Sequence, residues 1–238
     1  MSAKSGRAGA STRGLAEYRN LLRIALGLAA LAVAWIFWQF LPHAQHLGFV
    51  VVAALLVAFK LVMSLLERKI GTKIREEKQA VRGAVAEEKI GGLLDQLGGE
   101  LRVLHDVPCP FGNIDHVVVS KDHGVFLIET KAHGGRVAVV DSKIRVNGRL
   151  PEKDFVAQTL RNTYWLVEQI KGITGIDVWV NPLLVFTNAF VAPSRPLKGI
   201  TITNQKFLAS TVEGTNSPLP ARIWEAREEL LAALAPAH

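Results

Sequence analysis

Residues 113–131, NIDHVVVSKDHGVFLIETK, are the stretch that decides the fold. They predict two apolar β-strands joined by a polar turn at Lys121–Gly124. Because successive side chains of a strand point to opposite faces, Glu129 and Lys131 are expected to share one face. Asp115 lies near the start of the first strand. We therefore expect two carboxylates and a lysine to gather at one edge of an apolar hairpin.

These three side chains have the chemistry that metal-assisted hydrolysis of a phosphodiester needs. A divalent metal lowers the pKa of bound water and offsets charge on the phosphate, and Mg²⁺ prefers carboxylate oxygens. A lysine can orient the water or stabilise the developing charge. The simpler alternative is a surface ion pair between Glu129 and Lys131, which would contribute little to stability. The apolar run Phe126–Ile128 leads directly into Glu129, which indicates a buried strand and favours the site.

The sequence around the hairpin alternates between helical and strand patterns. This order predicts an α/β fold with a central mixed β-sheet flanked by helices. The other expected elements are a helix over 78–97, a strand over 101–107, a small hairpin over 136–146, a helix over 151–170, strands over 176–187 and 200–204, and a closing helix over 221–234.

Two segments of the hairpin, IDHVVV at 114–119 and GVFLIETK at 124–131, resemble the nuclease-related domain, NERD. This family is a branch of the PD-(D/E)XK nuclease superfamily, so the resemblance implies a restriction-endonuclease-like core. Upstream, residues 83–94 are similar to the family's helix with a Gly-X-X-Gly-Glu signature. Ala86 stands where the second glycine would be, so the acidic position falls on Glu87, with Glu88 as the alternative. Downstream, Gln158 resembles the family's helix glutamine.

The resemblance implies a catalytic set of Asp115, Glu129 and Lys131, supported by Glu87 and Gln158. Asp115 and Glu129 would hold Mg²⁺ or Mn²⁺, and Lys131 would position the water or stabilise the transition state. Glu87 would add an acid, and Gln158 would orient water or substrate. The implied activity is hydrolysis of DNA. The alternative is a nucleic-acid-binding or membrane-assembly module that keeps the fold without turnover, because few aromatic stacking residues are evident near the site.

Two apolar runs, residues 21–41 and 47–66, are each about as long as a helix that spans a bilayer. Lysines and arginines precede the first run and follow the second, and none lies between them. This distribution predicts a transmembrane hairpin with both flanks in the cytoplasm. We therefore expect a multi-pass protein of the inner (cytoplasmic) membrane, with the lipid bilayer as a partner and the C-terminal domain in the cytoplasm.

The bulk composition adds two constraints. The net charge of +7 fits a polyanionic partner or an anionic membrane surface, and the single cysteine, Cys109, excludes an internal disulfide. The predicted organisation is a disordered basic leader over 1–20, the transmembrane hairpin over 21–66, a charged connector over 67–81, a nuclease-like domain over 82–212, and a C-terminal helix packed on it within 213–238.

Overall fold

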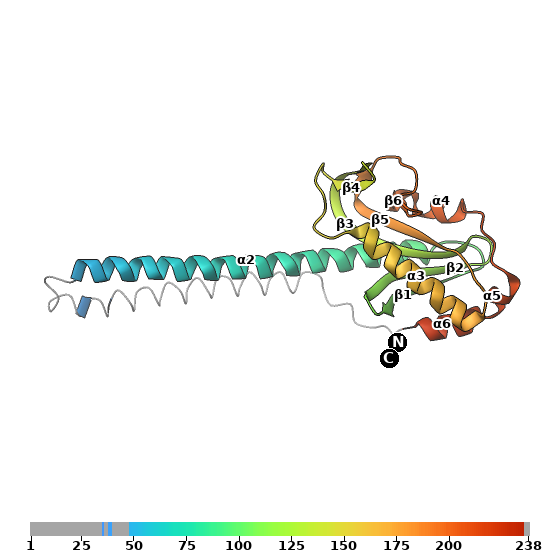
Figure 1. Ribbon diagram of the computed structural model, residues 1–238, viewed down its shortest axis with the longest axis horizontal. Helices are drawn as coiled ribbons and strands as arrows, with labels where there is room; N and C mark the ends of the chain where they lie inside the picture. Colours follow the sequence, from blue (N-terminus) through green and yellow to red (C-terminus); the bar gives the residue numbers. More distant parts are fainter. Residues whose placement is uncertain (1–34, 36–37, 40–47, 236–238) are drawn as a thin grey trace. The chain divides into compact units, whose positions relative to one another are not determined.

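The computed structural model describes residues 35, 38–39 and 48–235 (Figure 1). The chain divides into two compact units, Met1–Val81 and Arg82–His238. The predicted leader over 1–20 lies outside the described residues, as does the first predicted apolar helix over 21–41 apart from positions 35, 38 and 39.

From position 48 onward, the described residues of the first unit belong to a single helix, α2 (Gly48–Leu94). Its first part is the apolar run for which a second membrane span was predicted. The helix continues without a break through the charged residues 67–81, so the predicted connector is helical.

The membrane prediction needs correction. Within residues 48–235 and the few described positions before them, no helix is both long enough and apolar enough to cross a bilayer. The apolar run is not a self-contained helix, because it forms the first part of α2, and the same helix continues into a segment where charged residues are frequent. This finding contradicts the predicted multi-pass protein of the inner membrane and does not support the transmembrane hairpin over 21–66.

The second unit is built on a six-stranded mixed sheet. The order of its main strands is β1-β2-β3-β5-β6, and β4 pairs with β3 off this path. Strands β1, β2 and β3 are antiparallel neighbours, whereas β5 runs parallel to both β3 and β6. The predicted central mixed sheet is confirmed. The strands are β1 (Leu101–Cys109), β2 (Gly112–Ser120), β3 (Gly124–Val140), β4 (Lys143–Val146), β5 (Val180–Val191) and β6 (Thr201–Asn204).

Helices cover both faces of this sheet, as predicted (Figure 1). On one face, α3 (Phe155–Thr174), α5 (Ala221–Glu225) and α6 (Arg227–Leu234) pack through Leu166, Ile223 and Leu230. On the other face, the end of α2 packs beside α4 (Leu208–Glu213), which follows the short 3-10 helix η2 (Gln205–Phe207). The closing helix expected over 221–234 is therefore two short helices rather than one.

The hairpin predicted from residues 113–131 is present, and its pairing explains where the polar groups lie. Strands β2 and β3 pair from Ser120↔Gly124 to His116↔Ile128, and the pairing ends there. Asp115 and Glu129 are the next residues on the two strands, so they lie where β2 separates from β3. Strand β3 itself continues beside β5, with a register shift between Lys131 and Gly134, through the first strand of the small hairpin expected over 136–146.

Candidate active site

The Glu129 carboxylate is the centre of the site. Its side chain is 0% exposed, and its Oε2 atom accepts a hydrogen bond from Lys131 Nζ at 3.3 Å. The Lys131 side chain is 14% exposed, so the pair is largely removed from water. Burying a charge is costly unless partners stabilise it. This is not the surface ion pair considered as the simpler alternative.

Helix α3 supplies two more donors to the same carboxylate. Gln158 Nε2 donates to Glu129 Oε2 at 3.1 Å, and Asn162 Nδ2 donates to Glu129 Oε1 at 2.8 Å. Residues four apart lie on one face of a helix, so α3 presents both amides together. The helix begins after Asp154, whose side chain accepts a hydrogen bond from the Ala157 backbone. The hydrogen bonds from Gln158 and Asn162 hold both carboxylate oxygens of Glu129 in a fixed orientation.

Asn162 was not identified from the sequence. It is almost completely buried on the apolar face of α3. The available signal was a polar residue one helical turn after Gln158, at a position where the apolar pattern of the helix predicts burial. A buried amide needs a hydrogen-bond partner, and Glu129 is that partner.

Asp115 completes the acidic pair. Because β2 and β3 have separated at this point, the Thr130 backbone N–H donates to Asp115 Oδ2, at 2.6 Å. Burial, and after it the negative charge of Glu129, raise the pKa of Asp115 to about 7. The Thr130 hydrogen bond and the Lys131 charge act in the opposite direction and do not cancel this increase. In this buried site, the charge of Glu129 therefore opposes ionisation of Asp115.

Glu87 approaches from α2. Partial burial of its carboxyl group raises its pKa, and the charge of Asp106 raises it further. The charges of Lys131 and Glu129 also act on Glu87, and Glu87 in turn affects Asp115. Glu87 and the alternative acid, Glu88, both lie at exposed positions of α2, and Glu87 is the one whose charge acts on Asp115. The structure thus brings together all five residues singled out in the sequence, Asp115, Glu129, Lys131, Glu87 and Gln158; their roles remain predictions.

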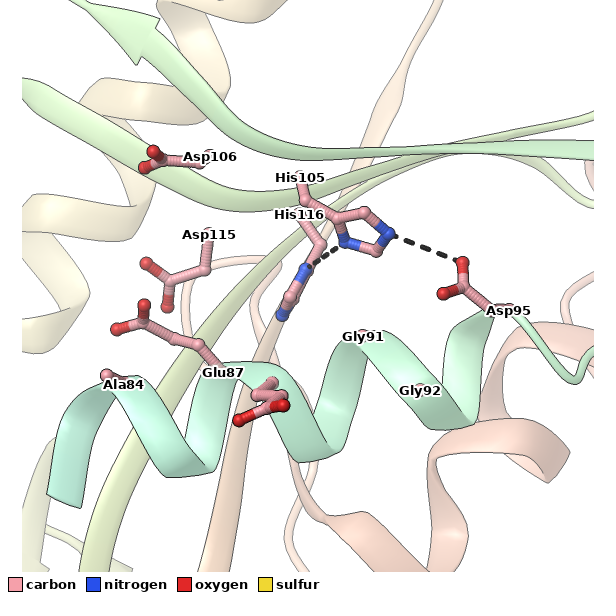
Figure 2. A pocket seen from close by; sticks show the side chains of 10 residues that line it. Ala84, Glu87, Gly91, Gly92, Asp95, His105, Asp106, Asp115 and His116 are labelled. Atoms are coloured by element: carbon pink, nitrogen blue, oxygen red, sulfur yellow. Dashed lines mark hydrogen bonds and ion pairs between the residues drawn. The ribbon is translucent and has the colours of Figure 1, made fainter. Parts of the chain in front are cut away.

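An open cavity of about 430 Å³ lies beside this cluster (Figure 2). Glu87 and Asp115 belong both to its lining and to the cluster around Glu129. Farther along, His116 Nδ1 lies 2.8 Å from His105 Nδ1, and His105 Nε2 lies 3.3 Å from Asp95 Oδ1 (Figure 2). Burial, and then the neighbouring His105, lower the pKa of His116 to about 4, so this buried imidazole is neutral near pH 7.

The donor atoms of the site fit Mg²⁺ or Mn²⁺. Across the described ranges, no group of three or more His, Cys, Asp or Glu side chains is arranged to hold a metal ion. Two carboxylates are nevertheless enough for Mg²⁺, which commonly takes one or two of them together with waters and substrate phosphate. Carboxylate oxygens have two acceptor positions each, so Glu129 can bind an ion while keeping its present hydrogen bonds. The repulsion that raises the pKa of Asp115 is what a cation would relieve.

Comparison with known families agrees with this architecture. Residues 82–187 match the family model described as the nuclease-related domain, NERD. No curated protein and no solved structure matches the chain. The matched segment contains the five predicted site residues and Asn162. This match and the mixed sheet flanked by helices support a nuclease-related protein, and the nuclease-related domain suggests an interaction with nucleic acid.

Proposed function

We propose that this chain is a metal-dependent nuclease that hydrolyses phosphodiester bonds of DNA, with Mg²⁺ or Mn²⁺ as its cofactor. The observation that carries the proposal is the fully buried Glu129 carboxylate, held by Lys131, Gln158 and Asn162 beside Asp115. Apolar residues of similar volume often stabilise a fold as well as a buried ion pair or better, so stability alone does not account for this arrangement. The match to the nuclease-related domain supports the same conclusion.

In this proposal Asp115 and Glu129 hold the cation, with both carboxylates oriented before substrate binds. Thr130 N–H fixes Asp115, and the two amides of α3 fix Glu129. When bound, the ion would lower the pKa of a water molecule and offset charge on the phosphate. Because the carboxylates cannot rotate freely, little reorganisation is needed when substrate enters.

Lys131 is proposed to orient the attacking water or to stabilise charge on the phosphate. Its ammonium has three N–H donors, and only the bond to Glu129 Oε2 is present in the site. The remaining donors can reach water or a phosphate oxygen at the point where Asp115 and Glu129 meet. Glu87, whose pKa is raised by burial and by Asp106, is suited to exchanging a proton at the side of the open cavity.

The test is cleavage of DNA by the full-length chain with Mg²⁺, with Mn²⁺, and with a chelator. We expect cleavage that the chelator abolishes, and a loss of at least about 100-fold in Glu129→Gln and in Lys131→Met. Glu168→Gln is the matched control, because Glu168 lies on an exposed position of α3. Circular dichroism of each variant separates lost chemistry from lost folding.

Two results would overturn the proposal. One is absence of cleavage by the wild type under all metal conditions. The other is equal cleavage by wild type and by folded Glu129→Gln and Lys131→Met. Salt-dependent DNA binding without any product would instead identify a nucleic-acid-binding module that keeps the nuclease fold.

A further inference from the structure

An exposed phenylalanine stacked against an arginine lies at the turn between β1 and β2. Phe111 is 49% exposed, and the Arg161 guanidinium carbon lies 4.8 Å from the centre of its ring. Arg161 comes from an exposed position of α3, far from Phe111 in the sequence. One side of the aromatic ring is thus held by a cation, while about half of the side chain stays open to solvent.

This pair is adjacent to the candidate active site. Arg161 directly precedes Asn162, the residue that donates to Glu129. Cys109, near the start of the same turn, lies with its Sγ 3.7 Å from Asn162 Oδ1. The turn and α3 are therefore held together at the residue that orients the catalytic carboxylate. Asp115 follows only four positions after Phe111, on β2.

A second pair of the same chemistry lies farther along the strand that carries Glu129. Arg136 on β3 and Phe190 on β5 are register partners, and the Arg136 guanidinium carbon is 5.5 Å from the ring centre. Phe190 is 57% exposed. Lys131 is the register partner of Phe186, which lies four positions before Phe190 on β5. The second pair therefore lies farther along the same two strands, on the order of 15 Å from Lys131.

These positions suit an unpaired stretch of nucleic acid better than a duplex. The bases of a duplex are stacked on one another, whereas an unpaired base has a free face that can stack on an aromatic ring. An arginine beside the ring adds positive charge for the neighbouring phosphate. Such stacking tolerates any base, because every base has such a face. The paired carboxylates would repel the backbone phosphates, and Arg161, next to the site, and Arg136, farther along β3, supply opposite charge.

We infer that Phe111 with Arg161 forms a base-stacking subsite next to the cleavage site, with Arg136 and Phe190 as a second contact, so that the substrate is DNA with a single-stranded segment. The inference rests on the proposed nuclease function for the identity of the ligand as DNA. Beyond the proposed function, the inference specifies that the bound DNA is single-stranded and names the residues that select it.

The test measures binding of the full-length chain to a single-stranded oligonucleotide and to the same sequence as a duplex, in a chelator so that no hydrolysis occurs. The single strand carries 2-aminopurine, whose fluorescence falls when it stacks. For the wild type we expect tighter binding of the single strand, accompanied by quenching. Phe111→Leu should weaken single-strand binding about 5- to 100-fold and remove the quenching, while duplex binding stays the same.

Phe207→Leu is the matched control, because Phe207 is 59% exposed and lies on η2. We expect wild-type affinity and quenching from this control. A further variant, Arg161→Gln, should reduce the slope of log affinity against log salt on the single strand by about 0.7, the value for one phosphate contact.

Three outcomes would overturn the inference: wild-type single-strand affinity and quenching in Phe111→Leu, an equal loss on single strand and duplex, or no preference of the wild type for the single strand. Cleavage with Mg²⁺ is measured in parallel. A chain that binds and quenches without cleaving contradicts the proposed function alone. A chain that cleaves while Phe111→Leu binds like the wild type contradicts the stacking subsite alone.

Discussion

Replacing Asp115 by asparagine is expected to stabilise the fold while removing activity. Burial and the charge of Glu129 raise the pKa of Asp115 from 3.8 to about 7. Between these two values, the folded chain holds a proton that the unfolded chain has released. Stability is therefore lost as the pH rises through this window, and the full cost is present above pH 7. Asparagine is neutral at every pH and can still accept the hydrogen bond from Thr130 N–H.

The size of the effect follows from the difference between the two pKa values. About 3 pKa units at 1.36 kcal/mol each give an upper limit of about 4 kcal/mol at pH 8. The same relation gives about 2 kcal/mol at pH 5 and about 0.5 kcal/mol at pH 4. We therefore expect Asp115→Asn to be more stable than the wild type at pH 8, with the difference shrinking as the pH falls.

The assay is urea unfolding of the full-length chain in a chelator, followed by tryptophan fluorescence at pH 8, 5 and 4. Asp122→Asn is the control, because Asp122 lies exposed on the turn between β2 and β3; it should change stability by no more than about 0.5 kcal/mol. Adding Mg²⁺ should stabilise the wild type, by about 2.7 kcal/mol at 100 times its dissociation constant, and should stabilise Asp115→Asn less. A variant that is no more stable than the wild type at pH 8, or a difference that does not vary with pH, would refute the reasoning.

Three further predictions concern the surroundings of the site. Asn162→Ala should lower the free energy of unfolding by about 1–3 kcal/mol, because it leaves a buried oxygen of Glu129 without a donor; unchanged urea unfolding would contradict this. Gly135→Ala should lower the free energy of unfolding by more than about 1 kcal/mol, since φ is +91° and a Cβ would overlap a neighbouring side chain. In the same urea assay, the control Gly172→Ala within α3 should instead raise it by about 0.5–1 kcal/mol. The pKa of His116 is lowered from 6.5 to about 4, so the wild type should lose stability as the pH falls below 6.5. Between pH 8 and pH 5, the free energy of unfolding of His116→Gln should therefore rise by about 2 kcal/mol relative to that of the wild type. A difference between the two proteins that does not change with pH would contradict this prediction.

Part of the site was readable in the sequence because it depends on local geometry. The alternation of residues 113–131 predicted the β2–β3 hairpin, and the period of a strand placed Glu129 and Lys131 on one face. Helical periodicity likewise predicted α3, although its start is Phe155 rather than Pro151. The family resemblance named Glu87 and Gln158, which local pattern alone could not connect with the hairpin.

The membrane prediction shows where composition misleads. A run of apolar residues was interpreted as a separate span because its length matched a bilayer. The predicted span was ended at Glu67, where the composition changes, but α2 continues through that position to Leu94. Backbone hydrogen bonding continues wherever helix-forming residues follow, so a change in polarity does not by itself end a helix.

By itself, the sequence determined the α/β class and the apolar hairpin with Glu129 and Lys131 on one face, because these follow from side-chain periods of two and 3.6 residues. Only the tertiary structure decided that Glu129 is completely buried, that Asn162 orients it, and that Phe111 meets Arg161. These contacts join segments far apart in the chain, and they depend on where α3 crosses the sheet and on where β2 separates from β3. No local pattern specifies that placement, because it results from the packing of all the apolar faces together.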